Sequence, residues 1–281
     1  MMAGTEDIPD ITLRPADKAD LENAHPDERH AFEYARDRLK GVYIGHGERP
    51  KAAVMFLDLA EFGSVAEYIA RCRTVHKGNA VRDAIRAGRL GYYPAFFNSK
   101  NHLGDMLAIH ESLPVRQGRR LPDDYFQTVE EQGGYPPSAY IDRPPRGALA
   151  WQRYFGLFLG KPGHKQGHLV LDKELIAYAH LRRYAETVFI NRFIGNAAHL
   201  ANGIMHKTHI DLVETLLKGR VLAGSDDAAP DRSMRGVRYL INGGYFGLLP
   251  DGYLGRTGGP GLLQWKLRML YRPGFFICDS D

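Results

Sequence analysis

This 281-residue sequence predicts an α/β fold, with helices on both sides of a mixed central sheet of about six to seven strands. Three strand-like runs follow one another between residues 154 and 195. Runs with helical spacing of apolar residues then alternate with two further strands. From residue 91 the predicted order is strand, helix, three strands, helix, strand, helix and strand.

The composition is that of a folded protein with a sizeable core, since 44% of the residues are hydrophobic and 11% aromatic. The net charge of +4 favours an anionic ligand but does not by itself predict a nucleic-acid partner. Cys72 and Cys278 are far apart and predict neither a disulfide framework nor a cysteine-rich zinc site. The N-terminus lacks a signal-peptide pattern and no apolar run approaches about 18 residues, so we expect a cytoplasmic protein with no membrane partner.

The first 90 residues are predicted to precede the main domain. Residues 1–25 are acidic and contain proline, which is typical of a flexible arm or an edge segment. Residues 26–90 are predicted to form an N-terminal extension, with a helix over 26–39, a strand over 52–59 and a helix over 64–73. The second helix opens with a serine followed three positions later by a glutamate, the capping-box pattern.

A basic patch closes this extension, and its members lie within about twenty positions of one another: Arg71, Arg73, His76, Lys77, Arg82, Arg86 and Arg89. Such a run predicts either a surface for phosphate or nucleic acid, or a solvated helix face.

Residues 91–281 form the predicted main domain. It begins with a strand over 91–98 and a helix over 103–114. A long loop rich in glycine and proline follows over 133–150, and we expect it to form a rim over a substrate.

The three consecutive strands are predicted over residues 154–160, 169–184 and 187–195. A turn is expected around Asp172 and Lys173 within the second of them. The residues after this turn alternate between polar and apolar types, which predicts one polar and one buried face.

The last part of the chain predicts a long helix in the second half of residues 195–220 and a strand over 237–249. A flexible link then leads into GLLQWKLRMLYRPGFFI, residues 261–277. This amphipathic run ends at an Arg-Pro pair and is predicted to be a helix followed by a final strand.

Two stretches resemble acyltransferases of the GNAT superfamily, and within it the FemAB-like branch. One is the closing helix and strand just quoted. The other is the arginine-rich stretch after the first strand of the main domain, whose matching residues are His102, Asp105, Ile109, Ser112, Arg116, Gln117, Gly118, Arg119 and Tyr125. The resemblance, together with the element order, extends over residues 91–281 and implies an N-acyltransferase that moves an acyl or aminoacyl group to an amine.

The resemblance also implies where the acyl donor binds. In GNAT-like enzymes the donor adds to the edge of the strand that corresponds to 187–195, so the backbones of Phe193, Ile194 and Gly195 are the expected donor contacts. The turn at 195–203, with Asn196 and Gly203, is the expected phosphate-binding turn. It lacks the family's pattern of an arginine or glutamine with two glycines, which argues against coenzyme A. The expected donors are therefore an acyl carrier protein or an aminoacyl-tRNA beside the family's usual acyl-CoA.

For catalysis the resemblance implies Lys266, in the position where many GNAT members have a tyrosine, as a cation that stabilises the reacting carbonyl. His206 is a candidate general base, because an unperturbed imidazole titrates near neutrality, and Tyr245 is a candidate proton donor. The candidate substrate-binding residues are Arg116, Gln117, Arg119, Tyr125 and Tyr253. Each has a structural alternative: the arginine-rich turn is equally suited to a clamp on loop carbonyls, and the tyrosines to packing.

Three other interpretations remain open. His164, His168, His199, His206 and His209 suggest a metal-dependent enzyme, although no HExxH signature is present and we expect no metal. The basic patch suggests a nucleic-acid-binding or nucleic-acid-modifying protein. The atypical donor turn also suits a member of the fold that has lost catalysis.

Overall fold

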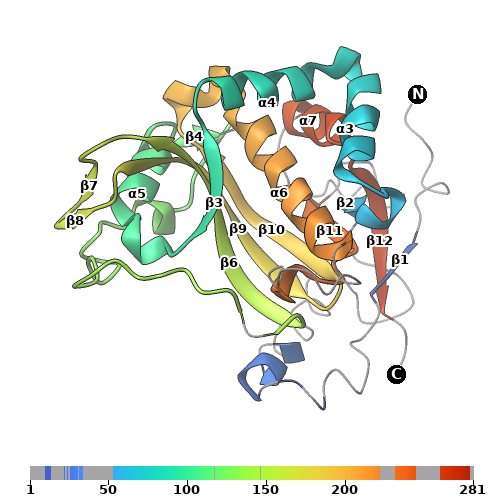
Figure 1. Ribbon diagram of the computed structural model, residues 1–281, viewed down its shortest axis with the longest axis horizontal. Helices are drawn as coiled ribbons and strands as arrows, with labels where there is room; N and C mark the ends of the chain where they lie inside the picture. Colours follow the sequence, from blue (N-terminus) through green and yellow to red (C-terminus); the bar gives the residue numbers. More distant parts are fainter. Residues whose placement is uncertain are drawn as a thin grey trace.

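The computed structural model describes residues 10–13, 22, 24, 26–30, 32–33, 53–116, 118–145, 147–221, 232–244 and 260–278. Its main feature is one eight-stranded mixed sheet (Figure 1). In spatial order the strands are β1 (Asp10–Leu13), β12 (Arg272–Cys278), β2 (Ala53–Asp58), β11 (Tyr239–Gly244), β10 (Thr187–Gly195), β9 (Lys173–Tyr184), β6 (Ala150–Gly160) and β3 (Tyr93–Phe97).

The protein is therefore α/β with a mixed sheet flanked by helices, as predicted. Without the four-residue edge strand β1, the sheet has seven strands. Neighbouring strands are antiparallel except for the pairs β10–β11 and β1–β12. The predicted order from residue 91 is also confirmed: β3, α5, β6, β9, β10, α6, β11, α7 and β12.

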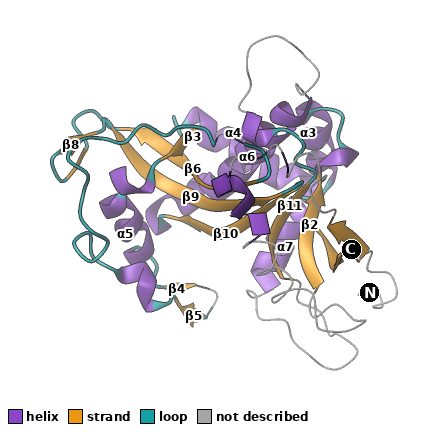
Figure 2. Cartoon of the chain, turned by 90° about the horizontal axis from the view of Figure 1, so that it is seen from below, coloured by secondary structure: helices purple, strands orange, loops and turns teal. Residues whose placement is uncertain are grey.

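Helices cover the two faces of the sheet (Figure 2). Helices α3 (Val65–Thr74), α4 (Asn79–Arg89) and α6 (Ile204–Val221) lie on one face, and α5 (Leu103–Glu111) lies on the other. Helix α7 (Pro260–Arg268) leads into β12. Two small hairpins, β4 (Val115–Arg116) with β5 (Arg119–Arg120) and β7 (Lys165–Gln166) with β8 (Leu169–Val170), stand apart from the main sheet.

Strand β2 comes from the predicted N-terminal extension but lies inside the sheet, hydrogen-bonded by β11 on one side and β12 on the other. In the predicted arm of residues 1–25, the described segment β1 is an edge strand, one of the two alternatives for that region. The boundaries at residues 26 and 91 stay predictions.

The capping-box prediction for α3 is confirmed at the first turn. Ser64 Oγ accepts a hydrogen bond from the Glu67 amide at 3.1 Å, and Glu67 Oε2 accepts one from the Gly63 amide at 2.8 Å. The predicted helix, strand and helix of this region do not include α4, although its buried residues, Ala80, Val81, Ala84 and Ala87, recur at helical spacing. The basic patch lies on α3, α4 and the turn between them, where Arg71 pairs with Glu61 and Arg86 with Asp83.

The prediction of one polar and one buried face for β9 is wrong for most of the strand. Ala177, Ala179 and Leu181 are fully buried on the side covered by α4 and α6. The residues that alternate with them, Ile176, Tyr178 and His180, are buried as well, because β9 is a central strand covered on both faces. The predicted turn is present, because Asp172 adopts φ 53° between β8 and β9. Strand β6 begins at Ala150, earlier than predicted, and the part of the predicted 237–249 strand beyond residue 244 lies outside the described residues.

None of the described helices is long and apolar enough to cross a membrane.

Candidate active site

The parallel strands β10 and β11 separate after a short paired segment. Their register joins Thr187 with Tyr239 and ends at Phe189 with Ile241. Strand β10 then shifts register between Ile190 and Arg192 and continues as far as Gly195 against β9. A parallel pair that diverges in this way leaves the second half of β10 without β11 along its edge.

Aromatic side chains from three elements meet beside this half of β10. The ring of Trp265, from α7, lies 5.3 Å from the ring of Phe193 on β10 and 5.2 Å from that of His209 on α6. The His206 ring, one turn earlier on α6, lies nearly parallel to the Trp265 ring at 6.2 Å. The closing helix, the long helix and β10 are therefore joined at one point by Trp265.

His206 lies between a carboxylate and the Trp265 ring. Its Nδ1 is 3.3 Å from Asp83 Oδ2 on α4, so the Nδ1 proton is held by Asp83 and the lone pair is on Nε2. Burial lowers the pKa of His206, and the carboxylate of Asp83 partly opposes that shift. His206 Nε2 and Trp265 Nε1 are both covered and have no hydrogen-bond partner. The site thus contains a neutral imidazole with an unused acceptor and an indole with an unused donor.

Gly203 explains how His206 reaches Asp83. Gly203 has φ +84°, and a Cβ atom there would lie 2.4 Å from the backbone oxygen of Asp83. A glycine is required both for this conformation and for this close approach. Helix α6 can therefore begin against α4, which places His206 one turn later beside Asp83.

Lys266 follows Trp265 and is buried, with 3% of its surface exposed. Burial lowers the pKa of Lys266 to about 8. Its carbonyl accepts hydrogen bonds from the amides of Met269 and Tyr271, both at 3.0 Å, which close the end of α7. The predicted catalytic lysine is thus the next residue after Trp265 in the chain, and the predicted histidine base lies beside the Trp265 ring.

His209 has a structural role in the same region. Its Nε2 lies 2.8 Å from the Tyr271 hydroxyl and its Nδ1 lies 3.4 Å from the Tyr68 hydroxyl. Burial lowers the pKa of His209 to about 3, so the ring is neutral. This chain of hydrogen bonds ties α6 to α3 and to the residue that precedes β12.

The predicted donor contacts are divided between the two faces of the sheet. Phe193 packs against Trp265, whereas Ile194 is buried in the cluster beneath α5. The Gly195 carbonyl accepts a hydrogen bond from Arg116 at 3.1 Å. The Asn196 side chain accepts one from the Ala198 amide at 3.0 Å and so begins the short 3₁₀ helix η6 (Ala197–Asn202) before α6.

The arginine-rich turn behaves as a clamp at Arg116, the structural alternative foreseen for it. Arg116 donates to the carbonyls of Ile109 and Gly195, joining the end of α5 to the end of β10. Tyr125 lies beneath the Arg192 guanidinium, 4.2 Å from it. Gln117, Tyr245 and Tyr253 lie outside the described residues, as does the side chain of Arg119, so their roles stay predictions.

The other histidines have separate partners. His199 Nδ1 lies 2.6 Å from the Tyr92 hydroxyl, His168 Nε2 lies 2.9 Å from the Pro136 carbonyl, and His164 Nε2 lies 2.9 Å from Asp105. Across the described residues, no three His, Cys, Asp or Glu side chains are placed to hold a metal ion.

Asp105, at the start of α5, is the centre of a second polar cluster. Its Oδ1 accepts hydrogen bonds from Gln166 at 2.7 Å and from His164 at 2.9 Å. Its Oδ2 accepts one from the Leu175 amide at 3.0 Å and lies 3.1 Å from His102 Nδ1. These contacts attach the β7–β8 hairpin to α5 and β9.

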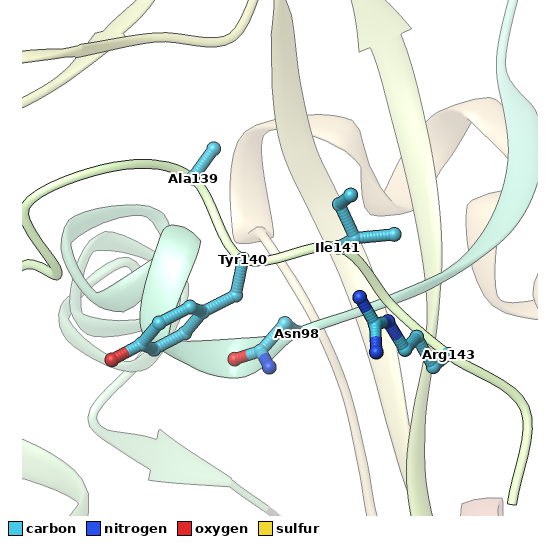
Figure 3. Close-up of a pocket in the computed structure, with 5 residues that line it drawn as sticks. All are labelled: Asn98, Ala139, Tyr140, Ile141 and Arg143. Atoms are coloured by element: carbon cyan, nitrogen blue, oxygen red, sulfur yellow. The ribbon is translucent and has the colours of Figure 1, made fainter.

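A shallow pocket lies where the predicted rim loop passes the end of β3 (Figure 3). It has a volume of about 500 Å³ and is lined by Asn98, Ala139, Tyr140, Ile141 and Arg143. Ile141 is 76% exposed there, so the loop presents apolar surface to solvent.

Asp83 is the site residue that the sequence did not reveal. It is more than a hundred positions from His206, and nothing in its local sequence distinguishes it from the other acidic residues of a surface helix. The importance of the Trp265 ring was likewise not visible, although its residue lies in the quoted closing helix.

Comparisons with known proteins are sparse. No protein family and no curated protein matches the sequence. Among solved structures, the chain is similar to the "C-terminal Domain (DUF2156) of Putative Lysylphosphatidylglycerol Synthetase from Agrobacterium fabrum". The two chains share 13% identity with a TM-score of 0.41, over 79% of this chain and 58% of that one. At this level of similarity the match selects neither a family nor a substrate.

Proposed function

We propose that this protein is an acyl- or aminoacyltransferase that acts on an amine acceptor where β10 and β11 diverge. The observation that carries the proposal is the combination of an unpartnered histidine nitrogen beside the Trp265 ring and a buried lysine at the next position of the chain. Buried ionisable groups with displaced pKa values and polar atoms without partners are concentrated at functional sites.

The proposed reaction is attack of the acceptor amine on the donor carbonyl. His206 Nε2 takes the proton that the amine nitrogen loses, while Asp83 holds the Nδ1 proton and keeps the imidazole in that tautomer. As the new C–N bond forms, the carbonyl oxygen becomes negative, and the Lys266 ammonium stabilises it. The bond to the leaving group then breaks, and the leaving group takes the proton from His206.

The donor would be held along the second half of β10, on the edge that β11 leaves. Amide and carbonyl groups on such an edge suit an extended arm, which would add to the sheet as another strand does. This arrangement favours a donor with a flexible linker, either a thioester arm or the end of an aminoacyl-tRNA. Because Trp265 and Phe193 occupy the adjoining space, the donor has to displace the tryptophan ring or pack against it.

The test is a transfer assay with labelled acyl-CoA and aminoacyl-tRNA donors and a panel of amines, with products identified by mass spectrometry. Lys266→Met removes the charge while filling the same buried volume, and we expect transfer to fall by roughly 10²–10³-fold. Lys218→Met is the matched control, because Lys218 is 62% exposed on α6 and pairs with Glu214 on the helix surface. Full transfer by a folded Lys266→Met protein would exclude this role for Lys266.

A further inference from the structure

The second half of β9 carries polar side chains, His180 and Arg182, on one face of a central strand, where an α/β fold usually has apolar ones. On the other face of this strand Ala177, Ala179 and Leu181 are fully buried under helices. A strand with neighbours on both sides usually packs apolar residues on each covered face. His180 and Arg182 instead alternate with that apolar row, and His180 is buried while Arg182 is half-buried.

Strand register places a row of polar groups across this face. His180 is paired with Tyr154 on β6 and with Arg192 on β10. The Tyr154 and His180 rings are stacked, 4.6 Å apart and 11° from parallel. The row therefore places a stacked pair of rings, of which Tyr154 is the more exposed, beside a guanidinium.

Arg182 differs from its neighbour Arg183. The Arg183 guanidinium donates to the carbonyls of Ala185, Ser233 and Arg235, at 2.5 to 2.6 Å. For Arg182, no ion pair with any carboxylate of the described residues is found, and its Nε is covered without a hydrogen-bond partner. One guanidinium is thus a structural clamp, while the adjacent one has unused donors.

The balance of charge on this face is positive. Arg182 and Arg192 both act on His180, and burial together with these two cations lowers its pKa to about 4, so it adds no charge near neutrality. Among the described residues, the carboxylate that contacts this group of side chains is Asp124. It pairs with Arg192 at 2.6 Å, and its side chain is 52% exposed. A half-buried cation without a counterion favours an anion.

We propose that Tyr154, His180, Arg182 and Arg192 form a binding site for an anionic group, a carboxylate or a phosphate ester attached to an organic body. The Arg182 guanidinium would bind the anion with paired hydrogen bonds, and the Arg192 guanidinium, which already pairs with Asp124, would add positive charge beside it. The stacked Tyr154 and His180 rings would contact the attached group. The site lies on the α5 side of the sheet, opposite the His206 and Trp265 cluster, and it stands whether or not the transfer reaction does.

The experiment is a calorimetric titration of the purified protein with phenyl phosphate, benzoate and inorganic phosphate. We expect saturable binding of an aromatic anion that weakens with added salt. The stronger of phenyl phosphate and benzoate identifies the anion as phosphate or carboxylate, and weaker binding of inorganic phosphate shows the contribution of the rings.

Arg182→Gln should raise the dissociation constant by about tenfold or more, because a charge-assisted hydrogen bond is lost. Arg192→Gln is a second variant at the same site. Lys218→Gln removes an exposed cation of α6 that lies outside both this site and the basic patch, and it should bind as the unmodified protein does. The melting temperature of each variant establishes that it is folded. Absence of saturable binding by every probe, or equal binding by folded Arg182→Gln and Arg192→Gln, would overturn the proposal.

Discussion

Two clusters in this molecule join histidine to aspartate, and they differ in how completely their hydrogen bonds are formed. In the Asp105 cluster both carboxylate oxygens are used, with His102, His164, Gln166 and the Leu175 amide as partners. In the His206 cluster Asp83 holds one side of the imidazole, while His206 Nε2 and Trp265 Nε1 have no partner.

This difference separates a structural cluster from a candidate chemical one. A buried polar atom left without a partner costs about 1–3 kcal/mol, so selection for stability alone would remove it. The Asp105 cluster has the form expected of a structural hydrogen-bond network that holds α5, β9 and the β7–β8 hairpin together. The His206 cluster retains unused hydrogen-bonding groups beside a buried lysine, as expected of a site that binds a substrate.

The largest stability effect should come from the structural cluster. Asp105→Ala would leave the His164, Gln166 and Leu175 donors buried without an acceptor, and we expect the free energy of unfolding to fall by about 3–5 kcal/mol in urea denaturation. Asp123→Ala is the control, because the Asp123 side chain is 96% exposed. If Asp105→Ala lowered the free energy of unfolding no more than Asp123→Ala does, the Asp105 cluster would not stabilise the fold.

Lys266 provides a smaller effect with a defined pH dependence. Burial lowers its pKa from 10.5 to about 8, which corresponds to about 3 kcal/mol of destabilisation while the lysine is charged in both states. At pH 7 Lys266→Met should therefore be more stable than the unmodified protein by up to about 3 kcal/mol.

Between pH 8 and 10.5 the folded lysine loses its proton before the unfolded one does, so the unmodified protein gains stability relative to Lys266→Met as pH rises. Denaturation of both proteins across this range measures the difference, and other titrating groups cancel in the comparison. A stability difference that stays constant with pH would show that Lys266 is not buried as a charged group.

The local parts of this structure could be predicted from sequence, and the assembled site could be predicted only in part. Periodic apolar residues and the capping pattern identified α3, α5, α6, α7 and seven strands of the main sheet, β2, β3, β6, β9, β10, β11 and β12, because these signals lie within a few turns of chain. Lys266 and His206 were identified as candidates by residue type and resemblance. Their common neighbour Trp265, and the pairing of His206 with Asp83, depend on the close approach of α6 to α4 at Gly203.

Arg116 is a case in which the residue type suggested substrate binding but the structure shows a contact with the backbone. Its residue type suits an anionic substrate equally well, but one of its terminal nitrogens donates to the carbonyls of Ile109 and Gly195. Arg182, which no motif singled out, has no ion pair among the described residues, and its Nε is buried without a hydrogen-bond partner. Tertiary contacts decide which arginine donates its hydrogen bonds to backbone carbonyls, and the local sequence does not predict this.

The central claim is that chemistry takes place at the unsatisfied histidine and not at the satisfied one. The direct measurement is the rate of transfer by His206→Gln and His164→Gln, compared at equal folded concentration. We predict that His206→Gln loses roughly 10²–10⁴-fold in rate, as expected for loss of a general base, while folded His164→Gln keeps the rate of the unmodified protein. Full activity in His206→Gln, with the loss found in His164→Gln instead, would contradict the account.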